Sequence, residues 1–137
     1  MKISILIPLY NEENTIVNIL SKIQDETKKL DEFNFEIIVI NDGSKDNSKK
    51  LLEENPSLYS NLISLDVNRG KGFAIREGLK KVSGEIILIQ DADLEYDPNE
   101  YSKLLKPFKE SNADVVYGSR FLGGDMVRLH FFWHYLA

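Results

Sequence analysis

Apolar runs alternate with amphipathic segments along most of the chain. Five short runs rich in Ile, Val and Leu are typical of buried β-strands. We expect these strands at Ile3–Leu9, Glu36–Ile40, Leu62–Val67, Glu85–Gln90 and Ala113–Tyr117. Between them, apolar residues recur at the spacing of one helix face, which predicts four amphipathic helices. The alternation of strands and helices predicts an α/β domain.

The predicted helices have recognisable starts and stops. The first, Glu13–Leu30, follows Asn11 as its expected N-cap and carries Ile16, Leu20, Ile23, Thr27 and Leu30 on one stripe. The second passes through Leu51 and Leu52 and stops before Pro56. The third follows Gly72, with Ile75, Leu79 and Val82 aligned. The fourth opens at Pro98 after Asp97 as the cap.

This element order predicts a doubly wound, mainly parallel sheet of Rossmann-like type with helices on both faces. In such folds, ligands bind outside the carboxyl ends of the strands, where the strand order reverses. Every predicted strand here ends in polar, Gly-rich sequence. These ends are Pro8–Glu12, Asn41–Ser44, Asn68–Gly72, Gln90–Asp93 and Gly118–Arg120. Loops are often polar, but acids together with Arg and Lys on one edge favour a site for a charged phosphate ester.

The run Ile86–Ile89 ends in an acidic motif that carries the strongest chemical signal. The run is expected to be a strand buried on both faces. Side chains two apart in an extended chain point the same way, so Asp91, Asp93 and Glu95 could aim oxygens at one point. Such oxygens suit Mg²⁺ or Mn²⁺. The alternative is an Asp-rich turn without a ligand.

Composition excludes several classes of protein. The 137 residues suit one domain, and 17 Lys and Arg against 22 Asp and Glu leave no basic run, so nucleic acid is not an expected partner. Cysteine is absent, which excludes a disulfide framework and a thiolate metal site. The opening Lys2–Leu9 is too short for a signal peptide, and no run of about 20 apolar residues could span a bilayer.

Aromatic residues gather in the last stretch, Met126–Ala137, which resembles the beginning of an amphipathic helix. Phe131, Phe132 and Trp133 need a cover there, from further chain, a second copy of the protein, or a membrane surface. We therefore expect the chain to be a C-terminally truncated piece of a longer protein, with residues 1–125 as one domain and residues 126–137 as the start of an acceptor-side or membrane-proximal helix.

Five motifs in order resemble the family 2 glycosyltransferases of GT-A fold. They are Pro8-Leu9-Tyr10-Asn11-Glu12-Glu13, Asn41-Asp42-Gly43-Ser44, Gly70-Lys71-Gly72, Asp91-Ala92-Asp93 and Gly118-Ser119-Arg120-Phe121. Each motif alone is weak, but the five together cover essentially the whole chain. The resemblance is greatest to the polyprenyl-phosphate sugar transferases, the dolichyl-phosphate mannose synthase type.

The resemblance implies a site for a nucleoside-diphosphate sugar. Pro8, Tyr10, Glu12 and Asp42 would hold the nucleoside, with Asp42 accepting from a base N–H, and Lys71 would lie near the nucleotide. The alternatives are a simple strand-to-helix turn with Ser44 as cap and a solvated surface lysine.

Asp91 and Asp93 would bind the divalent ion and, through it, the diphosphate, with Glu95 as a third ligand where relatives often carry Gln. Arg120 would contact a phosphate of the donor or of the lipid acceptor, unless it forms a structural salt bridge. Asp93 and Arg120 are thus the expected catalytic residues. Arg128, His130 and His134 lie where relatives approach the acceptor, and the histidines could equally be packing residues.

The implied reaction transfers the sugar with inversion to a polyprenyl phosphate at the cytoplasmic face of a membrane. A lipid phosphate oxygen is already anionic and needs no general base. If the acceptor is instead a saccharide hydroxyl, a carboxylate must take its proton, either Asp125 or one from further chain. A nucleotide-binding or assembly module without catalysis is the remaining alternative.

Other nucleotide and phosphate enzymes lack support in the sequence. No Gly-x-Gly-x-x-Gly follows the first strand, and no Gly-x-x-x-x-Gly-Lys-Ser/Thr is present. Asp-nucleophile phosphatases also use an Asp-x-Asp pair with Mg²⁺, but theirs ends the first strand, and here the pair ends the fourth.

Overall fold

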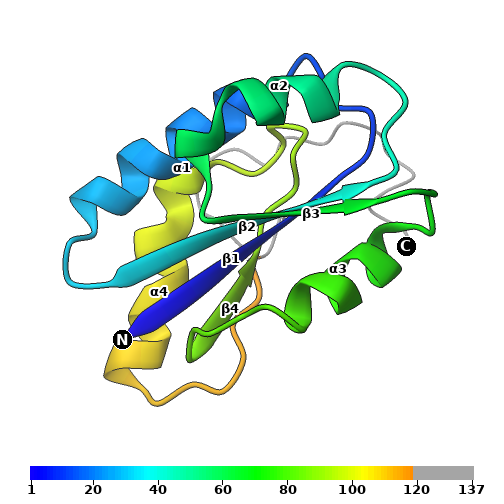
Figure 1. Cartoon of the computed structure of the whole chain (residues 1–137). Helices are drawn as coiled ribbons and strands as arrows, with labels where there is room; N and C mark the ends of the chain where they lie inside the picture. The colour runs from blue at the N-terminus through cyan, green and yellow to red at the C-terminus, as the bar shows by residue number, and fades with distance from the viewer. Residues whose placement is uncertain (119–137) are drawn as a thin grey trace, which may run out of the picture. The chain divides into compact units, whose positions relative to one another are not determined.

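Figure 1 shows the computed structural model of the chain, which describes residues 1–118. The chain divides into two compact units, Met1–Asn99 and Glu100–Ala137. The domain boundary expected between residues 125 and 126 lies outside the described residues.

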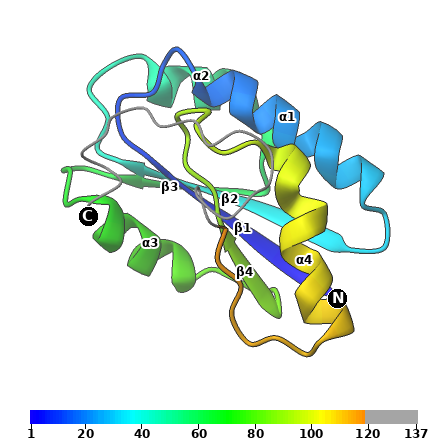
Figure 2. The ribbon, with the colours of Figure 1, turned by 180° about the vertical axis from the view of Figure 1, so that it is seen from behind.

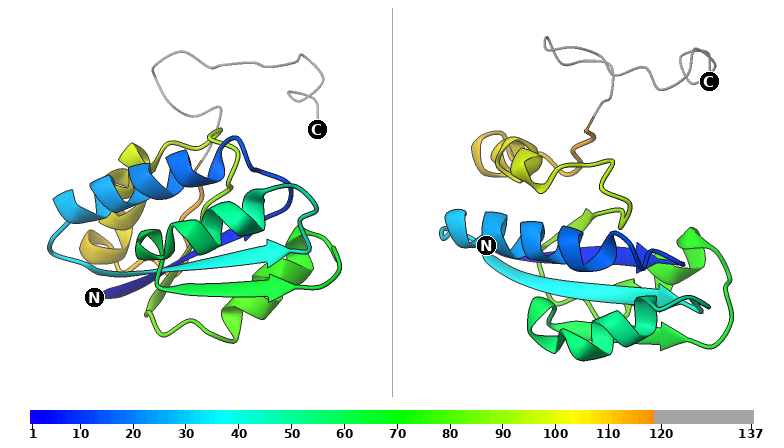
Figure 3. Two further views of the ribbon diagram at one scale, coloured as in Figure 1. Left: turned by 45° about the horizontal axis from the view of Figure 1, so that its top comes forward. Right: turned by 90° about the horizontal axis from the view of Figure 1, so that it is seen from above.

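A four-stranded parallel sheet forms the centre of the first unit. Its strands are β1 (Lys2–Leu9), β2 (Asn34–Asp42), β3 (Asn61–Leu65) and β4 (Ile86–Ile89). The order is β3-β2-β1-β4, and all three pairs are parallel. Figure 3 shows the arrows of β2 and β3 pointing the same way. The strand order reverses beside β1, which β2 and β4 flank, and this is where such folds bind ligands.

Helices cover both faces of the sheet. α1 (Ile16–Lys29) and α2 (Ser48–Glu54) lie on one side of it and α3 (Lys71–Leu79) on the other in Figures 1 and 2. α1 buries Ile16, Ile19, Leu20 and Ile23. On the α3 side, Leu6, Ile38, Ile40 and Ala74 form a fully buried cluster. A 3₁₀ turn, Pro56–Leu58, follows α2. No helix within residues 1–118 is long and apolar enough to cross a membrane.

The starts and faces of two helices differ from the sequence predictions. α1 begins at Ile16 rather than Glu13, and Asn11 is not its N-cap, since Asn11 has a φ of 55°. The Asn11 Oδ1 atom instead accepts the Lys45 N–H at 2.8 Å. Leu79 is exposed, because α3 turns the small residues Ala74 and Gly78 to the sheet. Small residues let the helix approach the strands closely.

The prediction that β4 is buried on both faces is wrong. Ile86 and Leu88 are buried, but Ile87 and Ile89 are 42% and 51% exposed. The register places Ile87 and Ile89 beside Ser4 and Leu6, on the α3 side of the sheet. α3 packs on β1 and β2, so it leaves this face of β4 uncovered.

The fourth predicted helix is present, but the fifth predicted strand is not. A 3₁₀ turn, Pro98–Glu100, leads into α4 (Tyr101–Glu110), and Asp97 Oδ1 caps that turn by accepting the Asn99 N–H at 3.1 Å. The segment predicted as a strand, residues 113–117, forms no ladder with any strand of the described chain. An apolar run becomes a strand only when its backbone groups find partners.

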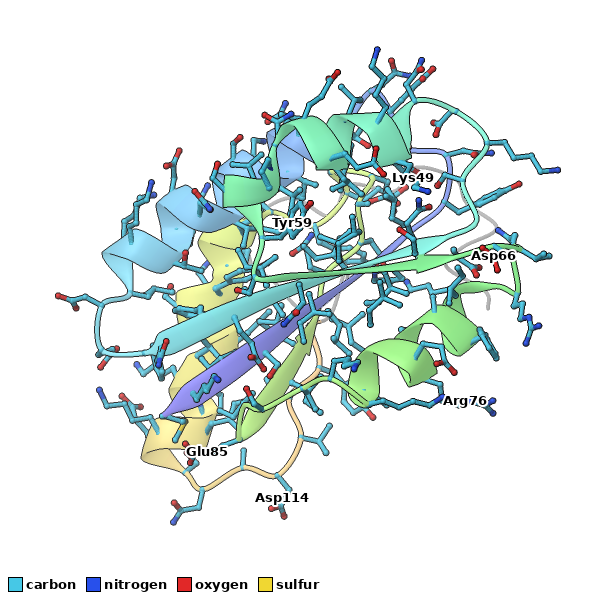
Figure 4. All side chains as sticks on the ribbon, viewed as in Figure 1. Lys49, Tyr59, Asp66, Arg76, Glu85 and Asp114 are labelled. Atoms are coloured by element: carbon cyan, nitrogen blue, oxygen red, sulfur yellow. The ribbon has the colours of Figure 1, made fainter. Side chains whose placement is uncertain are left out.

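A polar cluster ties together the amino ends of the strands, near Glu85 in Figure 4. Glu36 on β2 accepts the Ser83 N–H at 2.6 Å and the Ser83 Oγ–H at 2.7 Å, and it also accepts the Ser4 hydroxyl. The Lys2 Nζ atom lies 3.3 Å from Glu36 Oε2. Burial raises the pKa of Glu36, but these donors outweigh burial and lower its pKa to about 2.

Candidate functional site

A cavity of about 330 Å³ opens at the carboxyl ends of β1, β2 and β4. This is the end of the sheet that Asp66, which follows β3, marks in Figure 4. Seven residues predicted for the donor site line the cavity: Pro8, Tyr10, Glu12, Asp42, Lys71, Asp91 and Asp93. Parallel strands bring these residues together, because all their carboxyl ends meet at one edge.

Asp42, the last residue of β2, holds the loop that precedes α3. Its side chain is buried, and its carboxylate oxygens accept the Arg69 N–H at 3.0 and 3.1 Å. The Oδ2 atom also accepts the Gly70 N–H at 2.7 Å. Gly70 has a φ of 89°, in the region that favours glycine. Asp42 therefore fixes the backbone from which α3 and Lys71 begin.

The first two loops are joined by hydrogen bonds in both directions, since the Lys45 N–H of the second loop donates to Asn11 Oδ1 in the first. The Asn11 N–H donates to Ser44 Oγ at 3.0 Å, and the Glu12 N–H donates to Ser48 Oγ at 2.9 Å. The Glu13 N–H donates to Asp46 Oδ2 at 3.0 Å. Burial raises the pKa of Asp46, but the hydrogen bonds from Ser48 and the Glu13 N–H outweigh it and lower the pKa below its usual value. The two loops form one rigid wall beside the cavity.

The turn at Asn41–Ser44 has a structural function as well. The Ser44 N–H donates to Asn41 Oδ1 at 3.0 Å, which closes the turn, but α2 begins only at Ser48, so Ser44 does not cap it. At Gly43, φ is 69°, and a Cβ would lie 2.7 Å from the Asn68 backbone nitrogen. Glycine therefore lets this turn approach the loop before α3.

The acidic motif after β4 forms a turn rather than an extended chain. β4 ends at Ile89, and Asp93 Oδ1 accepts the Glu95 N–H at 3.0 Å. The Asp-rich turn considered from the sequence is therefore present, and the expectation of extended chain is wrong. Asp91 and Asp93 nevertheless both line the cavity, whereas Glu95 is not among its lining residues.

Lys71, the first residue of α3, reaches across the cavity to Asp91. Its Nζ atom lies 2.5 Å from Asp91 Oδ1, and the two side chains are 55% and 23% exposed. From its sequence, Lys71 was expected either near the nucleotide or as a solvated surface lysine. The structure shows a half-exposed Lys71 in an ion pair within the candidate site, and its contact with a nucleotide stays a prediction.

The charge of the lining suits a divalent cation. Glu12, Asp42, Asp91 and Asp93 place four carboxylates around the cavity against the one ammonium of Lys71 among the described lining residues. A diphosphate would be repelled by this set unless a cation accompanied it. Residues 1–118 contain no cluster of three potential metal ligands. Two carboxylates are sufficient for Mg²⁺ or Mn²⁺ when substrate oxygens and water complete the shell.

Four further lining residues were not singled out from the sequence: Leu9, Asn68, Ala74 and Ala92. Asn68 could have been found, since it opens the loop Asn68–Gly72 quoted for its charge. Leu9 and Ala92 are apolar residues within quoted motifs, and Ala74 follows the Gly70-Lys71-Gly72 motif by two residues; their side chains give no chemical signal. The predicted residues Arg120, Asp125, Arg128, His130 and His134 lie outside the described residues.

The chain is similar in sequence to curated sugar transferases. The chain is 33% identical over 128 residues to the dolichol-phosphate mannosyltransferase of Pyrococcus furiosus. This match covers 93% of this chain and 35% of the relative. It is 36% identical over 118 residues to the undecaprenyl-phosphate 4-deoxy-4-formamido-L-arabinose transferase of Proteus mirabilis, covering 84% and 36%. The chain thus spans about a third of the length of these curated relatives.

Solved structures show the same fold. A mannosyltransferase from Pyrobaculum calidifontis in complex with GDP-Man and Mn²⁺ matches with a TM-score of 0.65 and 26% identity, over 80% of this chain and 32% of that chain. Glucosyl-3-phosphoglycerate synthase from Mycobacterium tuberculosis, in complex with Mn²⁺, UDP and glucosyl-3-phosphoglycerate, matches with a TM-score of 0.63 and 27% identity, over 78% and 39%. The expected GT-A fold is confirmed.

The family model described as "Glycosyl transferase family 2" matches residues 4–132. Since this match extends over nearly the whole sequence, the chain belongs to glycosyl transferase family 2.

Proposed function

We propose that this chain carries the donor-binding part of a metal-dependent, inverting glycosyltransferase that moves a sugar from a nucleoside-diphosphate sugar to a polyprenyl phosphate. The observation that carries the proposal is the cavity at the strand ends, which gathers seven predicted donor-site residues from four separate segments of the chain. Polar and charged residues placed at a topological switch point are the usual mark of a ligand site in this type of sheet.

In this proposal, different residues of the cavity contact the nucleoside and the diphosphate of the donor. Pro8, Tyr10 and Glu12 from the first loop and Asp42 from β2 would contact the nucleoside. The Asp42 carboxylate already accepts backbone N–H groups, but each carboxylate oxygen has two lone pairs, so Asp42 can also accept from a base. Lys71 would meet the diphosphate.

Asp91 and Asp93 would hold the divalent cation. When bound, this ion stabilises the negative charge that develops on the departing diphosphate. Carboxylates are the hard ligands that Mg²⁺ and Mn²⁺ prefer, and the Pyrobaculum and Mycobacterium structures contain Mn²⁺. Glu95 is the weaker candidate ligand, since it does not line the cavity.

In the proposed reaction an acceptor oxygen attacks the anomeric carbon from the face opposite the diphosphate. The new bond joins that oxygen to the sugar, the bond to the diphosphate oxygen breaks, and its electron pair stays on the diphosphate. The curated relatives are named for dolichol phosphate and undecaprenyl phosphate, which supports a lipid phosphate acceptor. Such an acceptor is ionised near pH 7 and needs no general base. A lipid acceptor would also require the protein to work at a membrane, as a peripheral enzyme on the cytoplasmic face. Arg120 would contact a phosphate of the donor or of the lipid acceptor.

Calorimetric titration of UDP and GDP, each with Mn²⁺ and with EDTA, tests the donor site. We expect one nucleotide to bind with Mn²⁺ and to lose at least about tenfold in affinity with EDTA or in Asp93→Asn. Asp97→Asn is the matched control, because Asp97 lies four residues away and caps the Pro98 turn outside the cavity. Equal binding by Asp93→Asn and the unaltered chain would contradict the metal assignment.

Turnover distinguishes the remaining alternatives. A radiolabelled nucleotide sugar is incubated with Mn²⁺ and either a polyprenyl phosphate in detergent or an oligosaccharide. Transfer to the lipid supports the proposal, and transfer only to the oligosaccharide identifies a saccharide hydroxyl as acceptor. Metal-dependent binding without transfer to either indicates a binding module, or an activity that needs more of the length seen in the relatives.

A further inference from the structure

The ion pair between Lys71 and Asp91 joins the two charged parts of the candidate site. The Lys71 Nζ and Asp91 Oδ1 atoms are 2.5 Å apart, although the residues come from α3 and from the loop after β4. Both residues line the cavity. A carboxylate that would hold a divalent cation is therefore occupied by a cation that the chain itself supplies.

Helix α3 does not favour a lysine at this position. Lys71 is the first residue of α3, where the helix dipole is positive, and no acidic residue lies in the first turn. A positive side chain is unfavourable at this helix end. The ammonium is instead held by Asp91 across the cavity, which indicates that Lys71 serves the site rather than the helix.

Only the side chain of Lys71 needs to move to change partner. The two preceding residues, Arg69 and Gly70, donate their N–H groups to the buried Asp42 carboxylate, so the backbone before Lys71 is fixed. The Lys71 side chain is 55% exposed and has room to turn. A fixed base with a mobile ammonium is suited to an exchange of ionic partners.

We propose that Lys71 is the resident counter-ion of Asp91 and competes with the divalent cation until the nucleotide arrives. The ammonium then transfers from Asp91 to the diphosphate, and Asp91 becomes free for the metal. Metal and nucleotide each bind better when the other is present, and linkage requires the two effects to be equal. The inference depends on the proposed function for the identity of the nucleotide, but the competition at Asp91 can be measured with Mn²⁺ alone.

The test compares Mn²⁺ binding to the unaltered chain and to Lys71→Met, followed by the electron paramagnetic resonance signal of free Mn²⁺. Without nucleotide, we expect Lys71→Met to bind Mn²⁺ about twofold to fivefold more tightly, in line with the strength of a partly exposed ion pair. With Mn²⁺ present, the variant should bind the nucleotide more weakly. The coupling between metal and nucleotide should therefore shrink. Lys81→Met, the same change at an exposed lysine outside the cavity, should alter neither affinity.

Two further variants make the result decisive. Lys71→Gln keeps a polar side chain without the charge and should match Lys71→Met, which excludes an effect of the methionine. In Lys71→Met/Asp91→Asn the gain in Mn²⁺ affinity should disappear, because the gain acts through Asp91. Unchanged or weaker Mn²⁺ binding by Lys71→Met and Lys71→Gln would overturn the inference, even if the nucleotide still binds. If the unaltered chain binds no nucleotide, the proposed function is overturned, but the Mn²⁺ result still stands.

Discussion

Asp42 illustrates how one residue connects the fold to the site. It ends β2, lines the cavity, and accepts the backbone N–H groups of Arg69 and Gly70. A buried carboxylate that is fully hydrogen-bonded stabilises its surroundings, whereas a partly satisfied one does not. The loop before α3 therefore depends on the charge and on both oxygens of Asp42.

We expect Asp42→Asn to loosen this loop. The amide retains one oxygen, but its NH₂ group cannot accept the N–H groups that face it. The amide protons of Arg69 and Gly70 should exchange with solvent about tenfold faster, as measured by NMR hydrogen exchange. Asp66→Asn, at an exposed acid in the neighbouring loop, is the control and should leave these rates unchanged. Unaltered exchange in Asp42→Asn would show that other contacts hold the loop.

At the scale of single residues, sequence reasoning found chemistry better than it found contacts. Acids and a lysine after buried strands pointed to a charged ligand, and the cavity gathers seven of the predicted residues. The pairing of Lys71 with Asp91 was not foreseen, because the two are twenty positions apart and meet only through the strand order. The Glu36 cluster was missed for the same reason: its members lie on β1, on β2 and before β4.

At the scale of elements, Glu36 joins three parts of the sheet at the end away from the cavity. The structure lowers its pKa from 4.5 to about 2, so the folded chain prefers the ionised form. The stabilisation by Glu36 is therefore complete above pH 4.5 and is lost as the pH falls toward 2. The shift corresponds to roughly 3 kcal/mol of unfolding free energy.

Glu36→Gln should remove this dependence. We expect the free energy of unfolding at pH 7 to fall by roughly 3 kcal/mol and the stability to change less between pH 4.5 and 2 than in the unaltered chain. Urea unfolding measured across that pH range checks both expectations. The control is Glu54→Gln, at an exposed residue 3.8 Å from Lys50, where we expect little change. Parallel pH profiles for Glu36→Gln and the unaltered chain would contradict the assignment.

The elements themselves were largely predictable, because strand runs and helical stripes have different periods. The errors arose where tertiary contacts decide. Ile87 and Ile89 belong to an apolar run, yet no helix of the described chain covers their face. Val115 and Tyr117 belong to another, yet they find no strand partner within residues 1–118. An apolar run indicates that burying its side chains is favourable, but it does not indicate which part of the protein will cover them.

At the scale of the first unit, the sheet presents two edges of different character. β3 and β4 are the outer strands. Within residues 1–118, β4 pairs on one side only, with β1, and it exposes the side chains of Ile87 and Ile89. A strand edge with exposed apolar side chains is a template for pairing with another chain. Concentration-dependent self-association through β4 is therefore expected.

Ile87→Lys tests this expectation, since a charge on an edge strand opposes pairing. In sedimentation velocity experiments over a range of concentrations, the variant should remain monomeric where the unaltered chain associates. Its free energy of unfolding should change little, because Ile87 is already 42% exposed. Leu79→Lys is the matched control: Leu79 is 41% exposed but belongs to α3 and has no place in the strand edge, so this variant should associate like the unaltered chain. An equal reduction in both variants would assign the association to general surface hydrophobicity, whereas a reduction in Ile87→Lys alone would assign it to the β4 edge.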